Sequence, residues 1–269
     1  MTAPAAAKHV CWSFDDRREL ETCARAFLTE GLAAGEQVWY TAAGGPGGLS
    51  GWLDEAARAN PGAVQFVPLE SAYPAGAALD PPAQVAAYAQ ATEAALDAGY
   101  TGLCVVADGT PLVRTPAQLS AFARYESLVT RYIAAAPMRA VCGFDRVQLG
   151  DRPVAELACL HPVSNVTEVR FTLRAGPPGG PAILAGELDL AADEIFPAAL
   201  DHVRPQPIDR CIVFDATGLR FLDHRSLLHL QRYAEAADAT VVLRTPLTTA
   251  GKLATMLRMD RIRIEEAAR

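Results

Sequence analysis

Short apolar segments that alternate with longer amphipathic segments are the feature that most constrains how this chain of 269 residues can fold. The short segments are rich in valine, leucine and aromatic residues, which predicts buried strands, and the longer ones repeat apolar residues every three to four positions, which predicts helices. Alternation of strand and helix along a chain indicates an α/β fold, because each helix packs onto the sheet that the neighbouring strands form. We therefore expect sheets covered by helices.

The N-terminal part of the chain is predicted to form one parallel sheet. Its strands are expected at residues 9–14, 37–41, 64–69, 102–108 and 139–145, and its helices at residues 17–34, 49–59, 83–98, 116–135 and 151–160. Asp15 and Asp16 precede the first helix and are good N-caps, and Gly35 follows that helix as its stop. The connection between the first two strands is long enough for a right-handed parallel crossover.

A polar, β-branched segment follows and opens what we predict to be a second α/β domain. Strands are expected at residues 166–173, 182–189, 212–215, 240–244 and 262–264, and helices at residues 191–203, from Asp223 onward, and at residues 248–257. Asp223 stands directly before an apolar repeat of helical period and is predicted to be its N-cap. The predicted domains cover residues 8–163 and 166–266.

Composition and charge limit the class of protein. A net charge of −7 and a pI near 5.3 argue against direct binding to nucleic acid or to anionic membranes, since no overall field attracts phosphate. No apolar stretch approaches the roughly 20 residues that a membrane span needs, so we expect a cytoplasmic protein. The six cysteines are scattered and form no Cys-x-x-Cys pair, which favours buried free thiols over a metal or disulfide framework.

The N-terminal part resembles the MEDS sensory domain, over residues 8–162. The residues that carry the resemblance are the His9-Val10-Cys11 strand with Phe14-Asp15 behind it, the helix end from Phe27 to Glu36, the strand from Val141 to Arg146 and the closing Leu160-His161-Pro162. The resemblance implies a sensor related to regulators of one-carbon metabolism. That family in turn looks like a reduced RecA/KaiC-type core with three layers.

In a RecA-type core, a phosphate-binding loop would lie between the first strand and the first helix. Residues 12–19 contain neither the glycines whose amides would converge on a phosphate nor a lysine. Two aspartates at a helix N-terminus would instead repel a nucleotide. The glycine-rich segment at residues 44–48 also lacks the lysine that follows in a phosphate loop and is interpreted as a lid or a plain connection. We therefore expect no ATP hydrolysis and no enzymatic activity.

Polar residues near the ends of the predicted strands are the candidates for a ligand site. Ligands of open α/β sheets bind beyond the carboxyl ends of the strands, and Asp108 stands where a RecA-type core would hold its magnesium carboxylate. The candidate ligand-binding residues are His9, Phe14, Asp15, Thr41, Asp108, Asp145 and His161. Each could instead serve only as a local cap or turn former.

Two histidines and several aromatic residues leave further alternatives open. If His9 and His161 share a rim with Cys11, Cys142 or Asp145, they could form a ligand or metal pocket, since imidazole, thiolate and carboxylate are all donors. The alternative, that the histidines cap a strand and fix a turn, is preferred, and no metal site and no cofactor are assigned. The aromatic residues Trp12, Trp39, Tyr40 and Trp52 could line a small-molecule pocket or belong to the core.

The C-terminal part resembles the STAS domain of anti-sigma-factor antagonists, over residues 171–264. The resemblance rests on the strand that ends Gly186-Glu187-Leu188-Asp189, on the order strand, turn and Asp-capped helix at residues 212–230, and on the ending Arg244-Thr245-Pro246. In that family a serine in the loop is the phosphorylation site. Here the matching position is Arg225, a fixed charge, and Ser226 replaces a glycine.

The resemblance implies a surface for a partner protein. The candidate partner-binding or regulatory residues are Asp189, Thr217, Asp223, His224, Arg225 and Ser226. We expect them to gather at one end of the second sheet. Phosphorylation at Ser226 or Thr217 is the lesser alternative, and the two histidines, His224 and His229, are expected at solvated positions.

These observations lead to one main functional hypothesis. The chain is expected to be a non-enzymatic regulator of transcription, in which the first domain senses a small molecule or a cellular state and the second binds a partner such as an anti-sigma factor. The alternatives are a nucleotide-binding or enzymatic first domain regulated by the second, and a pair of interaction or homodimerisation scaffolds.

Overall fold

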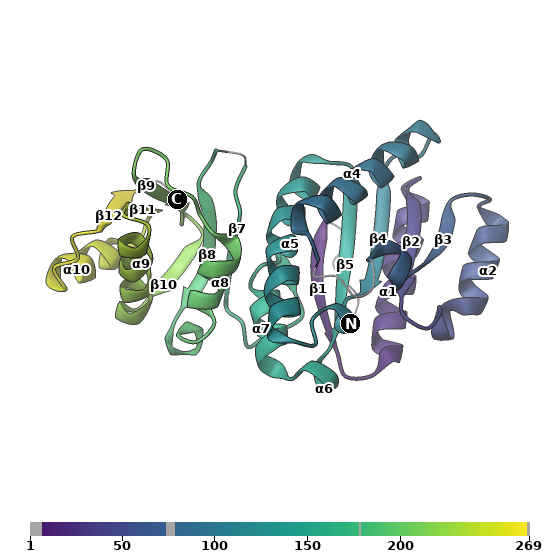
Figure 1. Cartoon of the computed structure of the whole chain (residues 1–269), viewed down its shortest axis with the longest axis horizontal. Coiled ribbons are helices and arrows are strands. Elements are labelled where there is room, and N and C mark those ends of the chain that lie inside the picture. The colour runs from purple at the N-terminus through teal and green to yellow at the C-terminus, as the bar shows by residue number, and fades with distance from the viewer. Residues whose placement is uncertain (1–6, 74–78, 178, 268–269) are drawn as a thin grey trace.

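The computed structural model describes residues 7–73, 79–177 and 179–267, and these form two sheets with helices packed between and around them (Figure 1). The first sheet is parallel, with the strand order β3-β2-β4-β5-β1-β6. Its strands are β1 (His9–Phe14), β2 (Gln37–Ala42), β3 (Val64–Pro68), β4 (Leu103–Asp108), β5 (Met138–Asp145) and β6 (Val163–Ser164). An α/β architecture with a parallel N-terminal sheet is thereby confirmed.

Two layers of helices cover this sheet because its strands present apolar side chains to both faces. Helices α1 (Arg17–Ala33) and α2 (Ser50–Ala59) pack on one face, and α4 (Pro81–Asp97), α5 (Pro116–Ala135) and α7 (Asp151–Ala158) pack on the other. Short helical turns lie at the ends of the strands. They are η1 (Gly47–Leu49), α3 (Leu69–Ala72), η2 (Thr110–Leu112) and α6 (Arg146–Leu149).

Local sequence explains where the main helices begin. Asp16 caps α1 by accepting a hydrogen bond from the amide of Arg18, as its position before an amphipathic repeat predicts. Helix α5 begins with a capping box, in which the Thr115 side chain accepts from the Gln118 amide and the Gln118 side chain accepts from the Thr115 amide. Pro116 occupies the first turn, where its missing N–H costs nothing.

The second sheet is mixed, with the order β10-β8-β9-β11-β12 and with β7 antiparallel to β8. Its strands are β7 (Phe171–Arg174), β8 (Ala182–Leu188), β9 (Cys211–Asp215), β10 (Leu219–Leu222), β11 (Thr240–Thr245) and β12 (Ile262–Glu266). Its helical elements are η3 (Leu190–Ala192), α8 (Phe196–Val203), α9 (His224–Ala236) and α10 (Thr248–Met256). Buried and half-buried side chains alternate along β8, so this sheet has one covered face and one partly open face.

The two sheets share one apolar core. A continuous cluster of buried side chains runs from Cys11 in β1, through α5 and α7, to Ile262 in β12. Helix α5 contacts both α8 and β7, and the amide of Leu173 in β7 donates to the carbonyl of Cys159 just after α7 over 2.8 Å. In Figure 1, α5 and α7 accordingly stand between the first sheet and the second. We infer that the two parts are mechanically coupled rather than joined by a loose tether.

Two predicted elements were wrong in extent. The strand expected over residues 166–173 begins only at Phe171, because the preceding segment crosses from the edge of one sheet to the other while Val166 and Val169 pack on the shared core. The helix expected over residues 191–203 is divided into η3 and α8, because Pro197 lacks an amide hydrogen and is tolerated only in the first turn of a helix.

The helix expected over residues 151–160 begins at Asp151, as predicted, and ends at Ala158 as α7. Gly150, with a φ of 81°, separates it from the short helix α6, which was not predicted. The six cysteines are thiols outside disulfide bonds, and five of them are buried, as expected. Among the described residues, no helix combines the length and the apolarity that crossing a lipid bilayer requires.

Candidate functional site

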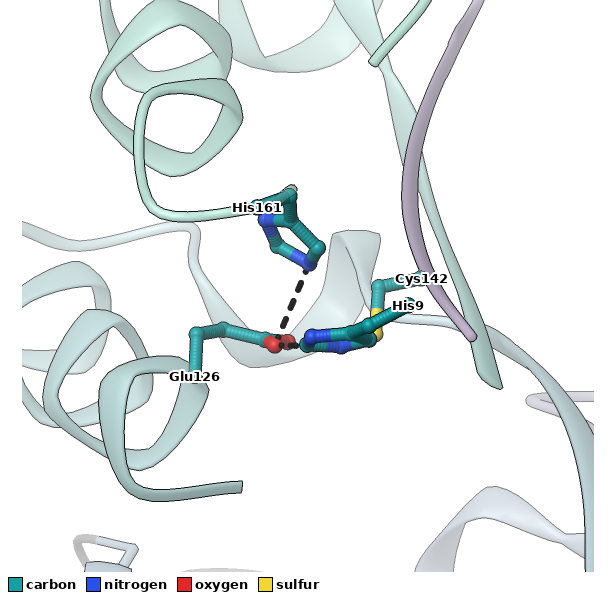
Figure 2. A group of neighbouring side chains, drawn as sticks. All are labelled: His9, Glu126, Cys142 and His161. Atoms are coloured by element: carbon teal, nitrogen blue, oxygen red, sulfur yellow. Dashed lines mark hydrogen bonds and ion pairs between the residues drawn. The ribbon is translucent and has the colours of Figure 1, made fainter. Parts of the chain in front are cut away.

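Four side chains with metal-binding and acid–base chemistry meet in the core beneath α5 (Figure 2). His9 begins β1, Cys142 lies in β5, Glu126 projects from α5 and His161 follows α7. The Nε2 atoms of His9 and His161 lie 3.1 and 3.2 Å from Oε2 of Glu126, and Cys142 Sγ lies 3.6 Å from His9 Nε2. All four side chains are buried, and their ligand atoms lie within 4.8 Å of one another. We call these four residues the core cluster.

Hydrogen bonds from outside the core cluster fix both imidazole rings. His161 Nδ1 lies 2.9 Å from the Leu157 carbonyl, which can only accept, so this nitrogen carries the hydrogen. His9 Nδ1 lies 2.9 Å from the hydroxyl of Thr130, one turn after Glu126 on α5. Both rings therefore turn Nε2 toward Glu126.

The charges of the core cluster depend on one another. Burial opposes ionisation of Glu126, but attraction to His161 and then to His9 outweighs burial and holds the pKa of this carboxyl group well below its usual range. Burial lowers the pKa of His9, and repulsion by His161 lowers it further against the opposing pull of Glu126. Burial, reinforced by the Glu126 carboxylate, raises the pKa of the Cys142 thiol. Without a bound cation, Cys142 is therefore protonated at neutral pH.

Several contacts in the core cluster are close without being aligned hydrogen bonds. Within the part of the chain that the structure describes, neither carboxylate oxygen of Glu126 and not Nε2 of His161 has a hydrogen-bond partner of good geometry. Buried polar atoms are nearly always hydrogen-bonded in folded proteins, so such atoms call for an explanation. These atoms lie close to one another, but their geometry is not that of donor and acceptor pairs.

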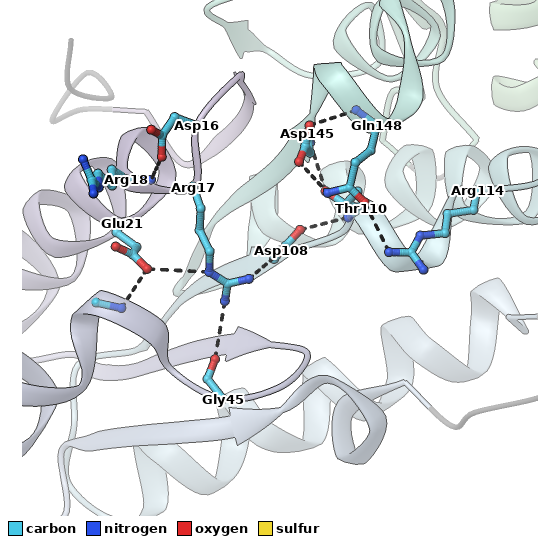
Figure 3. Close-up of polar contacts among 11 residues, drawn as sticks. Asp16, Arg17, Arg18, Glu21, Gly45, Asp108, Thr110, Arg114, Asp145 and Gln148 are labelled. Atoms are coloured by element: carbon cyan, nitrogen blue, oxygen red, sulfur yellow. Dashed lines mark hydrogen bonds and ion pairs between the residues drawn. The ribbon is translucent and has the colours of Figure 1, made fainter.

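A second polar network lies at the carboxyl ends of β1, β4 and β5 (Figure 3). Asp108 accepts from the Thr110 amide over 3.1 Å, and the Thr110 hydroxyl accepts from the Asp145 amide over 2.9 Å. Arg17 lies 3.7 Å from Asp108 and donates to the carbonyl of Gly45 over 3.4 Å. We call this network the rim. Through Thr110, it joins the carboxylate of Asp108 to the backbone amide of Asp145.

Carboxylates of the chain itself occupy the start of α1. Asp16 accepts from the Arg18 amide over 2.9 Å, and Glu21 accepts from the amide of Gly48 in the glycine-rich segment over 2.8 Å. Asp15 is held by Arg146, whose guanidinium donates to both of its oxygens and lowers the pKa of that carboxyl. The backbone amides of Arg18 and Gly48 and the guanidinium of Arg17, which could otherwise contact a phosphate, are thus bound by acidic side chains.

The structure divides the predicted ligand residues between two places. Asp15, Asp108 and Asp145 lie at the rim, whereas His9 and His161 lie in the core cluster, which is under α5 and not on a rim. The histidines were predicted separately from the strand ends. The structure brings His9 and His161 together with Cys142, as the alternative of a shared pocket required, but in the core and not on a rim, because His9 begins its strand and the rim is where strands end. Phe14 points into the apolar core.

Other candidates of the N-terminal part are core residues. Thr41 is fully buried next to Tyr40, and burial raises the pKa of Tyr40 to about 12. Trp12 is buried in the same layer, while Trp39 and Trp52 pack on the core from its margin. The core interpretation of the aromatic residues is thus the one that the structure favours.

Glu126 is the member of the core cluster that the sequence prediction missed. A signal was present, because Glu126 stands on the apolar stripe of α5 that Phe122, Val129 and Ile133 continue at helical spacing. A carboxylate at such a position is almost never fully buried unless it is paired. The partners of Glu126 are His9 in β1 and His161 after α7, and both are distant from it in the sequence.

A cavity of about 710 Å³ lies where α5 and α7 approach α8. Its lining includes Ser120 of α5, Arg152 and Glu156 of α7 and His202 of α8. Glu156 lies 3.1 Å from Arg152 and 3.7 Å from His202. Contact with His202, and then with Arg152, lowers the pKa of Glu156 against the effect of its burial. This carboxylate links the helices of the two parts.

The start of α9 forms the candidate regulatory surface of the C-terminal part. Asp223 caps α9 by accepting from the Ser226 amide over 2.8 Å, as predicted. Arg225 is exposed and lies 3.0 Å from Asp193, which also lies 2.8 Å from His229. His229 is therefore hydrogen-bonded to Asp193 and not the freely solvated residue that we expected, whereas His224 is exposed.

Two of the predicted regulatory residues differ from expectation in position or accessibility. Thr217 precedes β10 while Asp223 follows it, so Thr217 lies away from the others and hydrogen-bonds to Asp215 over 2.7 Å. The segment between the turn and Asp223 is the strand β10, and this strand places Thr217 and Asp223 at its two ends. Asp189 caps η3 at the end of β8. The hydroxyl of Ser226 is buried, and Ser226 is only 1% exposed.

The fold and the core cluster define an α/β protein with a buried ionisable centre next to a second, mixed-sheet domain. Residues 8–162 match the family described as "MEDS: MEthanogen/methylotroph, DcmR Sensory domain". This match covers more than half of the chain, so the chain belongs to the MEDS family, and a sensory role in signalling follows. No curated protein and no solved structure matched.

Proposed function

We propose that this chain is a non-enzymatic, cytoplasmic signalling protein in which the MEDS domain senses a small molecule or a cellular state. In this proposal the C-terminal domain is of the STAS type and passes the state to a partner protein, such as an anti-sigma factor, and so regulates transcription. The proposal goes beyond the family assignment, which covers the N-terminal part alone.

The observation that carries the proposal is the double role of α5. One face of this helix presents Glu126 to the core cluster, and the helix also packs against α8 and β7. Ser120 and Arg131 of α5 line cavities whose other walls include His202 and Val203 of α8. Because packed helices move as rigid elements, a change at Glu126 would be felt at α8.

Helix α7 provides a second connection from the core cluster to the C-terminal part. His161 follows α7 and is held to its Leu157 carbonyl, and Glu156 of the same helix faces His202. The buried thiol Cys159 lies between them, and its carbonyl accepts from the β7 amide. A shift of His161 would therefore reach both β7 and α8.

The rim supports the non-enzymatic part of the proposal. Arg17 is engaged by Asp108, Glu21 and the Gly45 carbonyl, and Asp16 caps the helix start. A nucleotide phosphate would meet carboxylates there and not free amides, which is unfavourable. Cysteines that form no disulfide bonds fit a reducing compartment.

Exposed apolar residues mark a surface where a partner could bind. Leu190, Phe221 and Leu228 are 66%, 50% and 38% exposed and lie on η3, β10 and α9, which adjoin Asp223 and Arg225. Large aromatic and arginine side chains contribute most to binding at protein interfaces. The fixed charge of Arg225 and the buried hydroxyl of Ser226 favour constitutive binding over control by phosphorylation.

Affinity capture with the full chain, from an extract of its native host, tests the partner proposal. We expect one signalling protein to be recovered with the wild type and its recovery to fall at least about tenfold with Phe221→Asp, as for an interface anchor. Met256→Asp, at a position 78% exposed on α10, is the matched control and should leave recovery unchanged. Recovery that is equal for both variants, or ATP turnover by the purified chain, would contradict the proposal.

A further inference from the structure

The four ligand atoms of the core cluster come from four different elements and enclose one point. A helix, two strands and the segment after α7 each contribute one donor, so the site exists only in the folded protein. We propose that His9, Glu126, Cys142 and His161 bind one divalent transition-metal ion of the zinc class. A role of this ion in signalling rests on the proposed function, whereas the binding of the ion does not.

The distances in the core cluster agree with a tetrahedral site. With Zn–N and Zn–O bonds of about 2.1 Å and a Zn–S bond of about 2.3 Å, ligand atoms of a tetrahedron lie about 3.4 Å apart for N and O and about 3.6 Å apart for N and S. The observed separations are 3.1 and 3.2 Å from Glu126 to the two imidazoles and 3.6 Å from Cys142 to His9. All four ligand atoms lie within 4.8 Å of one another, so the most distant of them must move inward to complete the coordination of an ion.

The orientation of the imidazoles is that of metal ligands. A metal-bound histidine usually donates its other ring N–H to a carbonyl or another oxygen, which fixes the ring. His161 does so to Leu157, and His9 Nδ1 contacts Thr130. Because Nδ1 of His161 carries the hydrogen that is donated to Leu157, Nε2 is the nitrogen available to a metal ion, and it faces carboxylate oxygens that themselves lack aligned donors. A shared cation satisfies all of these atoms.

The charges in the core cluster also suit a divalent ion. Binding would remove the proton from Cys142, and this proton leaves to solvent as the ion enters. The thiolate and the Glu126 carboxylate then carry two negative charges, the histidines are neutral, and the loaded site has no net charge. A neutral site costs little to bury, whereas a lone carboxylate is expensive in an apolar core.

The donor set selects the class of metal. Two imidazoles, a thiolate and a carboxylate suit zinc and its neighbours, whereas calcium and magnesium need a larger number of oxygen ligands. Four protein ligands leave no open coordination position. This matches a structural or sensory ion more closely than a catalytic one.

Cobalt substitution in the full chain tests the site directly. After removal of bound metal with a chelator, Co²⁺ is expected to bind at one equivalent per chain, with the intense visible bands of a tetrahedral ion and a thiolate charge-transfer band. Cys142→Ser should abolish the charge-transfer band, while Cys104→Ser, at a buried thiol in the other helix layer, should retain it. Absence of stoichiometric binding, or a charge-transfer band that persists in Cys142→Ser, would overturn the proposal.

The shift in Tm that Zn²⁺ causes provides a second test, which can still be carried out if one of the variants folds poorly. Zn²⁺ should raise the Tm of the wild type and of Cys104→Ser, and it should raise the Tm of Glu126→Gln much less, because one ligand is lost. Thr130→Val removes only the support of His9 and should weaken Zn²⁺ affinity about 10- to 100-fold without removing the site. Equal zinc shifts in the wild type and Glu126→Gln would exclude Glu126 as a ligand and overturn the proposal.

The two proposals fail separately. A chain that binds no metal and still captures its partner through Phe221 overturns the metal site alone. A chain that binds cobalt through Cys142 and captures no partner overturns the proposed function alone.

Discussion

Replacing Glu126 with glutamine is expected to destabilise the metal-free protein strongly. The substitution keeps the shape of the side chain and removes the negative charge that His9 and His161 contact at 3.1 and 3.2 Å. Glu126 is 0% exposed, so water cannot replace the lost charge. Since the imidazoles hold the pKa of Glu126 below its usual range, the ionised form favours the folded state, and a neutral residue forfeits that contribution.

The size of the effect follows from the burial of the contacts. Removal of one partner from a buried ion pair costs about 3–5 kcal/mol, and glutamine keeps some polar contact with the imidazoles, so we expect about 3 kcal/mol. For a chain of this size, each kcal/mol lowers the Tm by about 2–4 °C, which gives a decrease of roughly 6–12 °C. One transition is expected, because the apolar core is continuous between the two sheets.

Thermal unfolding followed by circular dichroism, in the presence of a chelator, measures this effect. Glu93→Gln, at an exposed position on the neighbouring helix α4, is the matched control and should change the Tm by no more than about 2 °C, as for other surface substitutions. A decrease for Glu126→Gln no larger than that of the control would refute the reasoning, since Glu126 would then not stabilise the fold through its imidazole partners.

Three further predictions concern the domain contact, the second sheet and the regulatory loop. Contact with His202 lowers the pKa of Glu156 below its ordinary 4.5, so its carboxylate stabilises the fold above that pH and loses this contribution as the pH falls through the lowered pKa. The Tm difference between wild type and Glu156→Gln should therefore be present near pH 7 and shrink steadily as the pH falls below 4.5. Gly186→Ala should lower the free energy of unfolding in urea by more than about 2 kcal/mol, because its φ is +93° and the new methyl group would lie 2.1 Å from a backbone oxygen. The control Gly44→Ala meets no atom within 4 Å and should lower it by about 1 kcal/mol. Equal losses for the two variants would contradict this prediction. Incubation with kinases and phosphopeptide mapping should find no stoichiometric phosphate at Ser226, whose hydroxyl is buried, and phosphate found there in the folded protein would show that the helix start opens.

Features that depend on neighbouring residues could be predicted from the sequence. Asp16 and Asp223 were recognised as helix caps because a cap needs only its own helix. Strands β1, β4 and β5 of the first sheet were recognised because both of their faces are buried, so that their sequences are nearly continuous apolar runs. The family match over residues 8–162 confirms the resemblance that the His9 strand and the Leu160-His161-Pro162 ending carry.

Features that depend on contacts between distant segments could not be predicted in this way. The core cluster joins residues up to 152 positions apart, from His9 to His161, and nothing local in the sequence indicates that Glu126 lies between them. Strand β6 has two residues and exists because the edge of β1 is available to it. The RecA-like and STAS assignments stay predictions, as do the domain boundaries.

The position of α5 between the two sheets also has a consequence for synthesis of the chain on the ribosome. The first sheet is complete once β6 has emerged, but α8, which covers the outer side of α5, follows about 30–40 residues later, roughly 2–8 s at ordinary rates of translation. During that interval the newly folded first sheet presents an uncovered helical surface to its surroundings. A nascent chain of this kind is a natural client for chaperones that bind exposed apolar helices.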